Sequence, residues 1–384
     1  MRLARIALAG AALVLAGCST WWNPLVTVGL MNEPPNKPTP LAPINAQVTP
    51  RAAWTTKVGK SYGFDFRPSY SGGRIWVASG DGTLSALEED SGRVAEKIDA
   101  KKKLSGGIEV GDGMAVVGTM KGEVLAFDIG DGKKRWESSV GGEVIAPAAI
   151  SNKMVVVRTA DGRILGLNAD DGKRKWIFQR AAPSLLLRSD AGVLAIGKDV
   201  VAGYANGKLI ALDIDDGKQT WEVTVSLPRG ATELERIADI AGLPVVDGGN
   251  VCAGAYQGKV ACFEIQSRNM LWSRDLSTSR SVAVDKKNVY VVDDTSAVQA
   301  LDKAAGASVW KQDKLVNRRL TPPVLLDGRI VVGDLQGFLH VISPENGEII
   351  GRMPTDGTAV KSILPIAGGL IVQTDGGSVV MVRI

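Results

Sequence analysis

One sequence phrase recurs along the chain, and this repeat constrains the fold more than any other feature. It reads Gly-x-apolar-x-small-apolar-acidic, then Asp-Gly, then Trp, as in GEVLAFDIGDGKKRW at residues 122–136, and it returns at 162–176 and 207–221. Weaker copies begin at residues 82, 258, 296 and 337, so that successive copies start 38 to 51 residues apart. A period near forty residues is typical of radial or stacked repeat proteins.

Each copy contains several short strands separated by turns. Met154–Arg158 and Ile164–Leu167 are apolar runs joined by a turn, and Trp176 begins a third strand after the turn at Asp171-Gly172. The connection to the next copy has room for a fourth strand. Four antiparallel strands per repeat indicate a propeller blade rather than a helical solenoid. The tryptophan, which stands at a fixed position in all copies except those that begin at residues 82 and 337, is expected to pack between neighbouring blades.

The number of blades follows from the copies and from the two ends of the chain. Seven phrases can be counted, and an eighth begins near Gly377 but stops at Ile384, before its outer strand. Residues 51–58, which include Trp54, supply a matching strand at the other end. We therefore predict an all-β fold over residues 51–384: an eight-bladed β-propeller of four-stranded antiparallel blades, closed by the N-terminal strand, with seven blades as the alternative. Closure removes free sheet edges.

The first residues have the pattern of an export signal. Two arginines precede the apolar stretch Ile6–Ala16, which is too short for a lasting membrane span. The stretch ends in Leu-Ala-Gly-Cys18, which resembles the cleavage box of bacterial lipoproteins. The resemblance implies that residues 1–17 are a signal peptide and that Cys18 carries the lipid. An ordinary signal peptide with a chance cysteine is the alternative.

Residues 18–50 are rich in proline, which blocks regular structure, and we predict that they form a lipidated tether. Ser19 follows the cysteine, where an aspartate would be expected of a lipoprotein kept in the inner membrane. By analogy with other lipoproteins, the protein is expected at the periplasmic face of the outer membrane, attached through its lipid anchor.

Composition and motifs argue against catalysis and against nucleic-acid binding. A net charge of +4 on 384 residues is too small to indicate a nucleic-acid partner. His340 is the only histidine and falls where another copy has Leu125, so a packing role is expected. The repeated acids Asp128, Asp213 and Asp302 lie beside turns, where carboxylates bind backbone N–H groups. No spacing matches a metal or dinucleotide site, and we expect no catalytic residue, cofactor or metal.

Cys252 and Cys262 fall on neighbouring predicted strands of the fifth blade. A cross-strand disulfide is open to them in an oxidising compartment. However, the equivalent positions in another copy are Val156 and Gly166, which are core positions. The comparison favours two buried thiols, and the sequence leaves the question open.

Two connections between copies are longer than the rest. Trp176 to Gly207 spans 31 residues and Trp221 to Gly258 spans 37, against 26 between an earlier pair. Both lead from the last strand of one blade to the first strand of the next, so we predict that they are neighbours on one face. The first contains PSLLLR and the second TELERIADI, whose Thr232 and Glu235 form a capping box that predicts a short helix.

Leucines, arginines and acids gathered on one face predict a protein-docking surface. The alternative is that the leucines fold back and seal the loops. The lipoprotein box, the tether, the tryptophan repeat and these two loop motifs together resemble the BamB family, lipoproteins of the bacterial β-barrel assembly machinery. The family's docking residues map onto Leu185, Leu187, Arg188 and Asp239. The family can carry another acid where this chain has Ala241.

The resemblance implies a non-enzymatic outer-membrane scaffold. Such a protein binds the POTRA domains of BamA together with other Bam subunits, and aids the folding and insertion of outer-membrane proteins. Direct contact between the blade edges and unfolded client strands, by β-augmentation, is a second hypothesis.

The repeat also resembles that of pyrroloquinoline-quinone (PQQ) dehydrogenases, whose tryptophans dock adjacent blades. This likeness implies the alternative of a periplasmic quinoprotein oxidoreductase. Those enzymes are typically longer, bind their cofactor with calcium and often join two adjacent cysteines, whereas this chain has no adjacent cysteine pair. Fold likeness alone assigns no function.

Overall fold

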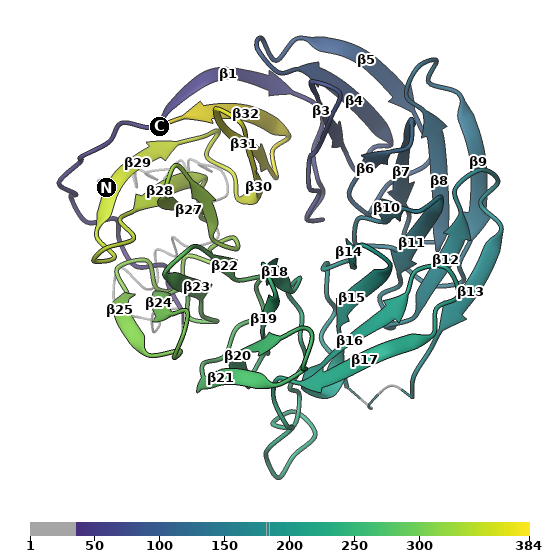
Figure 1. The fold of residues 1–384 in the computed structure, drawn as a ribbon. Coiled ribbons are helices and arrows are strands. Elements are labelled where there is room, and N and C mark those ends of the chain that lie inside the picture. The colour runs from purple at the N-terminus through teal and green to yellow at the C-terminus, as the bar shows by residue number, and fades with distance from the viewer. Residues whose placement is uncertain (1–35, 182, 184) are drawn as a thin grey trace, which may run out of the picture. The chain divides into compact units, whose positions relative to one another are not determined.

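The computed structural model describes residues 36–181, 183 and 185–384. The chain divides into two units, residues 1–38 and 39–384. The second unit consists of eight four-stranded antiparallel sheets arranged around a central axis (Figure 1). The prediction of an eight-bladed propeller is confirmed. The predicted signal peptide and Cys18 lie outside the described residues.

Each blade is a meander whose strands run from the axis outward. Blades 1 to 4 are formed by β2 (Ser69–Ser71), β3 (Arg74–Ala78), β4 (Thr83–Glu88) and β5 (Val94–Asp99); β6 (Glu109–Gly111), β7 (Met114–Gly118), β8 (Glu123–Asp128) and β9 (Lys134–Ser139); β10 (Ala149–Ser151), β11 (Met154–Arg158), β12 (Ile164–Asn168) and β13 (Arg174–Phe178); and β14 (Leu194–Ile196), β15 (Asp199–Gly203), β16 (Lys208–Asp213) and β17 (Gln219–Thr224). A single 3-10 turn, η1 (Ala205–Gly207), joins β15 to β16.

Blades 5 to 7 repeat this order, and blade 8 combines both ends of the chain. Their strands are β18 (Val245–Asp247), β19 (Asn250–Gly254), β20 (Lys259–Glu264) and β21 (Met270–Asp275); β22 (Ala283–Val284), β23 (Asn288–Val292), β24 (Val298–Asp302) and β25 (Ser308–Gln312); β26 (Val324–Leu326), β27 (Arg329–Gly333), β28 (Phe338–Ile342) and β29 (Ile349–Pro354); and β30 (Val360–Ile366), β31 (Gly369–Thr374), β32 (Ser378–Arg383) and β1 (Arg51–Lys57).

The ring closes through the N-terminal strand, as predicted. β1 pairs antiparallel with β32, with Thr55 opposite Val380, and forms the outer strand of blade 8 (Figure 1). The middle strands of the blades are apolar at nearly every position because each sheet is covered on both faces by its neighbours. The core therefore lies between blades.

The repeated tryptophans join neighbouring blades. The indole N–H of Trp136 donates to the Ala169 carbonyl at 2.7 Å, and its ring lies against Gly172 of the next blade. Gly172 has a φ of +69°, and an added Cβ would lie 2.5 Å from the ring, so both conformation and space require glycine. The same indole-to-carbonyl bond is made by Trp54, Trp176, Trp272 and Trp310.

The repeated acids also behave as predicted. Asp128 accepts hydrogen bonds from the backbone N–H groups of Gly130 and Asp131, at 2.7 and 3.2 Å. Asp213 and Asp302 bind the equivalent N–H groups of their own turns. These carboxylates hold the turns between the third and fourth strands of the blades, and they are a structural part of the repeat.

The predicted tether boundary at residue 50 is placed too late in the chain. Leu41, Ile44 and Val48 pack against the core of blade 7 and its neighbours. The N–H groups of Gln47 and Val48 donate to the Ile350 carbonyl on β29, so this segment covers the outer edge of blade 7. The prolines exclude a regular strand, yet the apolar side chains between them are partly buried against the propeller.

His340 is fully buried, as expected, but its surroundings are polar. Its Nε2 lies 2.9 Å from Asp334 Oδ2, and its Nδ1 accepts a hydrogen bond from Arg352 at 3.2 Å. Arg318, also buried, donates to the same carboxylate at 2.7 Å. The two arginines also donate to the carbonyls of Thr39 and Ala42. This cluster, the Asp334 network, connects blade 7 to the N-terminal segment.

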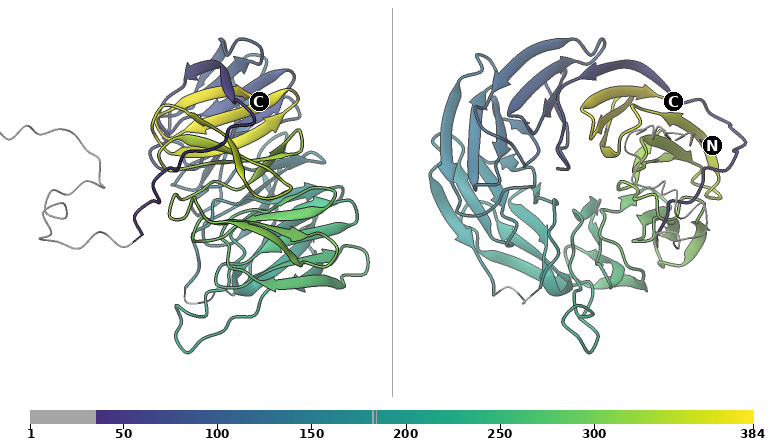
Figure 2. Two further views of the ribbon diagram at one scale, coloured as in Figure 1. Left: turned by 90° about the vertical axis from the view of Figure 1, so that its left-hand side faces the viewer. Right: turned by 180° about the vertical axis from the view of Figure 1, so that it is seen from behind.

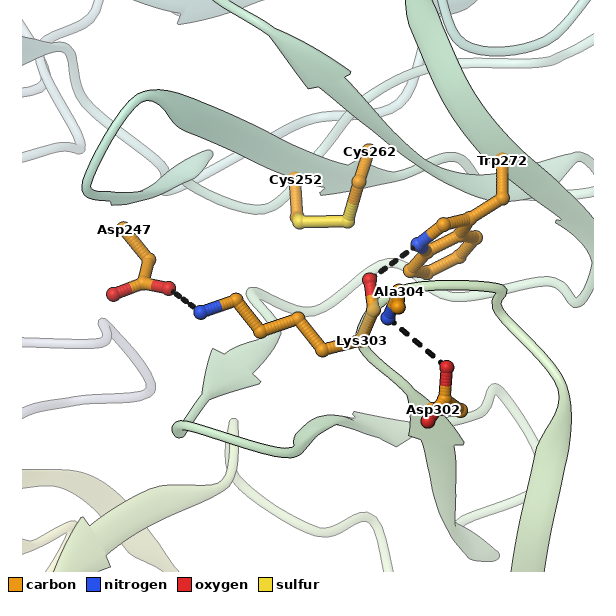
Figure 3. The surroundings of a disulfide bond; sticks show 7 residues. All are labelled: Asp247, Cys252, Cys262, Trp272, Asp302, Lys303 and Ala304. Atoms are coloured by element: carbon orange, nitrogen blue, oxygen red, sulfur yellow. Dashed lines mark hydrogen bonds and ion pairs between the residues drawn. A yellow bond between two sulfur atoms is a disulfide. The ribbon is translucent and has the colours of Figure 1, made fainter.

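Cys252 and Cys262 form a disulfide, so the expectation of two free thiols is wrong (Figure 3). They lie directly opposite each other on β19 and β20, with their Cα atoms 4.1 Å apart. Side chains are closest at such non-hydrogen-bonded cross-strand pairs. The positions are core positions, as the repeat indicated, and the sulfur atoms meet there.

Replacing the disulfide by the residues of blade 4, Cys252→Val with Cys262→Ala, should lower the free energy of unfolding by about 2 kcal/mol, because a loop closed in the unfolded chain is opened. In blade 4 the same two positions hold Val201 opposite Ala211, so the packing is preserved. Urea unfolding of both proteins measures the difference. The reduced wild type should match the variant, and an alkylation assay showing two free thiols in the exported protein would contradict the prediction.

Candidate functional site

The two long connections are neighbours on one face of the propeller, as predicted. The first loop, residues 179–193, joins β13 to β14, and the second loop, residues 225–244, joins β17 to β18. Ser189 donates to the Ala241 carbonyl at 2.7 Å, which links the two loops directly. The second loop projects well beyond the strands, at the bottom of Figure 1 and in both views of Figure 2.

The capping box in the second loop forms without the predicted helix. Glu235 N–H donates to the Thr232 hydroxyl at 3.2 Å, and Thr232 N–H donates to the Glu235 carboxylate at 3.1 Å. Only one helical turn follows, closed by Arg236 N–H on the Thr232 carbonyl. Beyond it Ala238 and Ile240 are buried, so tertiary packing draws the chain away before a second turn can form.

The leucines of the first loop divide between surface and interior. Leu185 is 42 % exposed, whereas Leu186 and Leu187 are partly buried. The second loop exposes Leu227 and Leu234, which are 63 % and 65 % exposed. The face therefore presents apolar side chains to solvent, which is a common feature of interaction sites. The sequence did not distinguish these two leucines from the rest of their loop.

Arg188 is exposed, and its guanidinium contacts two side chains outside the two long loops. Its Nη2 donates to Glu143 at 2.8 Å and lies 3.2 Å from the sulfur of Met120. Both partners belong to blade 2 and the connection that follows it, so the first loop reaches across blade 3. Sequence reasoning missed Met120 and Glu143 because their blade follows the template and carries no unusual motif.

Asp239 is buried, with 5 % of its surface exposed. One carboxylate oxygen accepts the N–H of Leu187 at 2.7 Å, and the other accepts the N–H of Asn206 at 3.2 Å. The side chain therefore fixes the first loop against the second loop and against the turn after β15. Ala241, two residues on, is also buried and offers little surface to a partner.

Asp239→Ala should loosen the first loop while the propeller stays folded. Two backbone N–H groups lose their acceptor, which costs about 1–3 kcal/mol locally. Hydrogen exchange at the Leu187 and Asn206 amides should accelerate at least tenfold. The Gly172 amide, bonded to the Asn168 carbonyl in the turn on the opposite face, is the control and should not change. Unchanged protection of Leu187 would contradict this role of Asp239.

The axis of the propeller is lined by charges that pair with one another. Lys361 lies 2.7 Å from Asp65, and Arg67 lies 4.0 Å from Asp190. Burial, followed by the charge of Asp190, raises the pKa of Asp65.

Among the residues that the structure describes, no group of three or more His, Cys, Asp or Glu side chains is placed to hold a metal ion. No helix in the described part of the chain is long and apolar enough to cross a membrane.

Comparisons with known proteins agree with this architecture. A family model described as "Outer membrane protein assembly factor BamB" matches residues 80–312. The protein of that name from Nitrosomonas eutropha is 45 % identical over 341 residues, which cover 88 % of this chain and 82 % of the relative. The Escherichia coli protein of the same name is 34 % identical over 99 % of both chains.

Solved structures show the same fold. The crystal structure of BamB from Moraxella catarrhalis aligns with a TM-score of 0.82 and 27 % identity over 88 % of this chain and all of that chain. Quinohemoprotein alcohol dehydrogenase from Comamonas testosteroni aligns with a TM-score of 0.70 but 12 % identity, a likeness that concerns the fold alone. The chain belongs to the BamB family of outer membrane protein assembly factors.

Proposed function

We propose that this chain is a non-enzymatic scaffold of the β-barrel assembly machinery that docks on the POTRA domains of BamA. The docking surface consists of Leu185 and Arg188, which are exposed, and of Leu187 and Asp239, which lie beneath the surface and support the loops. The observation that carries the proposal is the joining of the two long loops on one face, with Leu185 and Arg188 directed to solvent.

The chemistry of this surface suits a protein partner. An exposed leucine beside an arginine supplies apolar area and a charge that can donate several hydrogen bonds, and arginine is common among the residues that dominate binding energy. Asp239 acts indirectly, because its carboxylate is occupied by the N–H groups that position the loops. Full-length relatives named as outer membrane protein assembly factors support membership of the same machinery.

The scaffold would be held at the periplasmic face of the outer membrane by a lipid on Cys18. The lipoprotein box in the sequence supports this attachment, and residues up to Pro38 would span the distance from the lipid to the propeller. The proposed tether ends before Thr39, because residues 39–50 are bound to the propeller.

Co-purification from detergent-solubilised envelopes tests the proposal. The tagged full-length chain should bring down BamA and the other Bam subunits, and mass spectrometry of its N-terminal peptide should show acylated Cys18. Loss of BamA on substitution of Leu185 and Arg188 together would support the docking surface. Efficient capture of BamA by the doubly substituted protein would place the contact elsewhere.

A further inference from the structure

A cavity of about 310 Å³ lies beside the docking surface. Leu186 and Leu187 of the first loop and Ile240 of the second loop form its apolar walls. The turns after β11 and β15 complete it with backbone and polar groups, including Tyr204 and Asn206. Its volume is at the lower end of the range for sites that enclose small ligands, so it can take one side chain.

Arg158, the last residue of β11, lines this cavity and forms no ion pair with any described residue. Its guanidinium lies 5.5 Å from the centroid of the Tyr204 ring, and one of its N–H groups donates to the Ala191 carbonyl at 3.3 Å. No carboxylate among the described residues lies within ion-pair distance of it. An arginine has five N–H donors, so most of its hydrogen-bonding capacity is unused.

The other charged groups of the cavity wall are already paired. Arg180 and Lys208 both bind Glu222, at 2.7 and 3.1 Å. Asp161 accepts from Arg163 at 2.9 Å, and Asp239 accepts the two backbone N–H groups that fix the loops. Arg158 is therefore the one cation of this cavity wall outside an ion pair, and Asp239, the one carboxylate outside an ion pair, is occupied by backbone N–H groups.

The environment of Arg158 favours an anionic occupant. Desolvation lowers the pKa of its guanidinium, and the charges of Tyr204 and Asp239 oppose this effect without cancelling it. A carboxylate entering the cavity would restore the lost solvation with short, charge-assisted hydrogen bonds, which arginine can make in pairs. Leu186 and Leu187 would enclose the methylene groups that carry the carboxylate.

We propose that this cavity receives the carboxylate side chain of a glutamate or aspartate from the protein that docks on the two loops, and that Arg158 binds it. The inference rests on the proposed function. A protein side chain is favoured over a free acid because the loop that lines the cavity with Leu186 and Leu187 also presents Leu185 and Arg188 to solvent. A segment resting on those two residues therefore passes next to the cavity.

The affinity of the purified full-length lipoprotein, in detergent, for the POTRA domains of BamA tests this assignment. Arg158→Gln, which keeps the shape of the side chain and removes its charge, should weaken binding at least tenfold. Arg180→Gln is the matched control, because Arg180 lines the same cavity but is already paired with Glu222. The control should change the affinity less than threefold. Equal effects of the two substitutions would overturn the assignment and leave docking on the loops intact.

A second measurement decides the case if wild-type protein does not bind POTRA domains, or if Arg158→Gln does not fold. The arginine side-chain N–H signals of ¹⁵N-labelled wild-type protein are recorded by NMR during titration with N-acetylglutamate and, separately, N-acetylglutamine. The Arg158 signal, assigned with Arg158→Lys, should shift with the acid and stay unchanged with the amide. Failure of N-acetylglutamate to move that signal would then reject the carboxylate site, whereas failure of wild-type binding alone rejects only the proposed partner.

Discussion

Asp334→Asn should lower the free energy of unfolding of the propeller by about 3–5 kcal/mol, because it removes the only anion from the Asp334 network and leaves buried arginine charge uncompensated. Asp334 is fully buried and binds Arg318 and His340 through one oxygen. Its other oxygen accepts the N–H groups of Gln336 and Phe338, both at 2.9 Å. Asparagine fits the space but supplies neither the charge nor the second acceptor.

Urea unfolding measures this loss, and blade 6 offers a matched control. Asp293 occupies the same turn position and accepts the N–H groups of Thr295 and Ala297, but no buried arginine faces it. Asp293→Asn should therefore cost about 1 kcal/mol, the typical value of a hydrogen bond. Equal unfolding midpoints for the two variants would show that the ionic part of the Asp334 network adds nothing to stability.

The network should also make stability depend on pH. Burial lowers the pKa of His340, and although Asp334 opposes this effect, the charges of Arg352 and Arg318 add to it. The native histidine thus stays neutral where the unfolded chain, with an ordinary pKa near 6.5, takes up a proton. The stability that the neutral His340 contributes is therefore retained above about pH 6.5 and falls below it, by up to about 1.4 kcal/mol per pH unit.

Unfolding free energies measured between pH 7.5 and 5.5 test this dependence. In His340→Gln the histidine is absent, so its contribution is the difference in slope between the wild type and the variant. Glu109, whose pKa burial raises to about 7, titrates in both proteins over this interval and contributes a slope of opposite sign to each. The pKa of Asp334 is lowered as well, since hydrogen bonds and neighbouring charges outweigh its desolvation. Its contribution is lost only at more acidic pH and in the same direction. Equal slopes in the wild type and in His340→Gln would show that His340 does not contribute to the pH dependence.

Arg188→Ala should weaken the binding of POTRA domains by about 2 kcal/mol or more, roughly a thirtyfold rise in Kd, as expected of an arginine near the centre of an interface. In the free protein Arg188 pairs with Glu143, and both side chains are substantially exposed, at 55 % and 43 %. Such an exposed pair contributes little to folding, so the substitution should leave the unfolding temperature nearly unchanged.

Two further variants show whether the effect on affinity is specific to Arg188 and whether it depends on the ion pair with Glu143. Arg135→Ala removes a similarly paired arginine from the opposite face, where it binds Asp128, and should leave the affinity unchanged. Glu143→Gln releases Arg188 from its internal partner and should preserve or modestly strengthen binding. If Arg188→Ala binds as tightly as the wild type, as measured by titration calorimetry, the first loop is not the docking site. If Glu143→Gln weakens binding as strongly, the ion pair acts as a unit.

The fold could be predicted because its determinants are local and repeated. Every copy carries its own strands, and most carry a turn acid such as Asp128 and a tryptophan that meets a glycine at a fixed place in the next copy. A pattern read several times is insensitive to single departures, such as Arg268 in the place of a turn glycine. The regular length of the other connections also identified the two long loops, because an insertion can be recognised only by comparison with the repeat.

Contacts between distant segments could not be read in this way. Asp239 looked like a surface acid and is a buried acceptor, because its partners, the Leu187 and Asn206 amides, come from other loops. Likewise, the sequence of blade 2 and of the connection after it contains no motif that predicts the ion pair between Glu143 and Arg188. The capping box at Thr232 was correct as a local motif, but the packing of the residues after it decided that no helix follows.

The sequence by itself therefore determined the closed eight-bladed ring, the pairing of the terminal strand and the face on which the long loops lie. These features depend on the repeat period and on turn residues, whose effects act within one copy or between adjacent copies. Only the tertiary structure decided that Cys252 and Cys262 are joined, that residues 39–50 cover blade 7, and that Arg158 stays outside any ion pair. Each of these depends on where side chains point after packing, and a one-dimensional pattern carries no record of that direction.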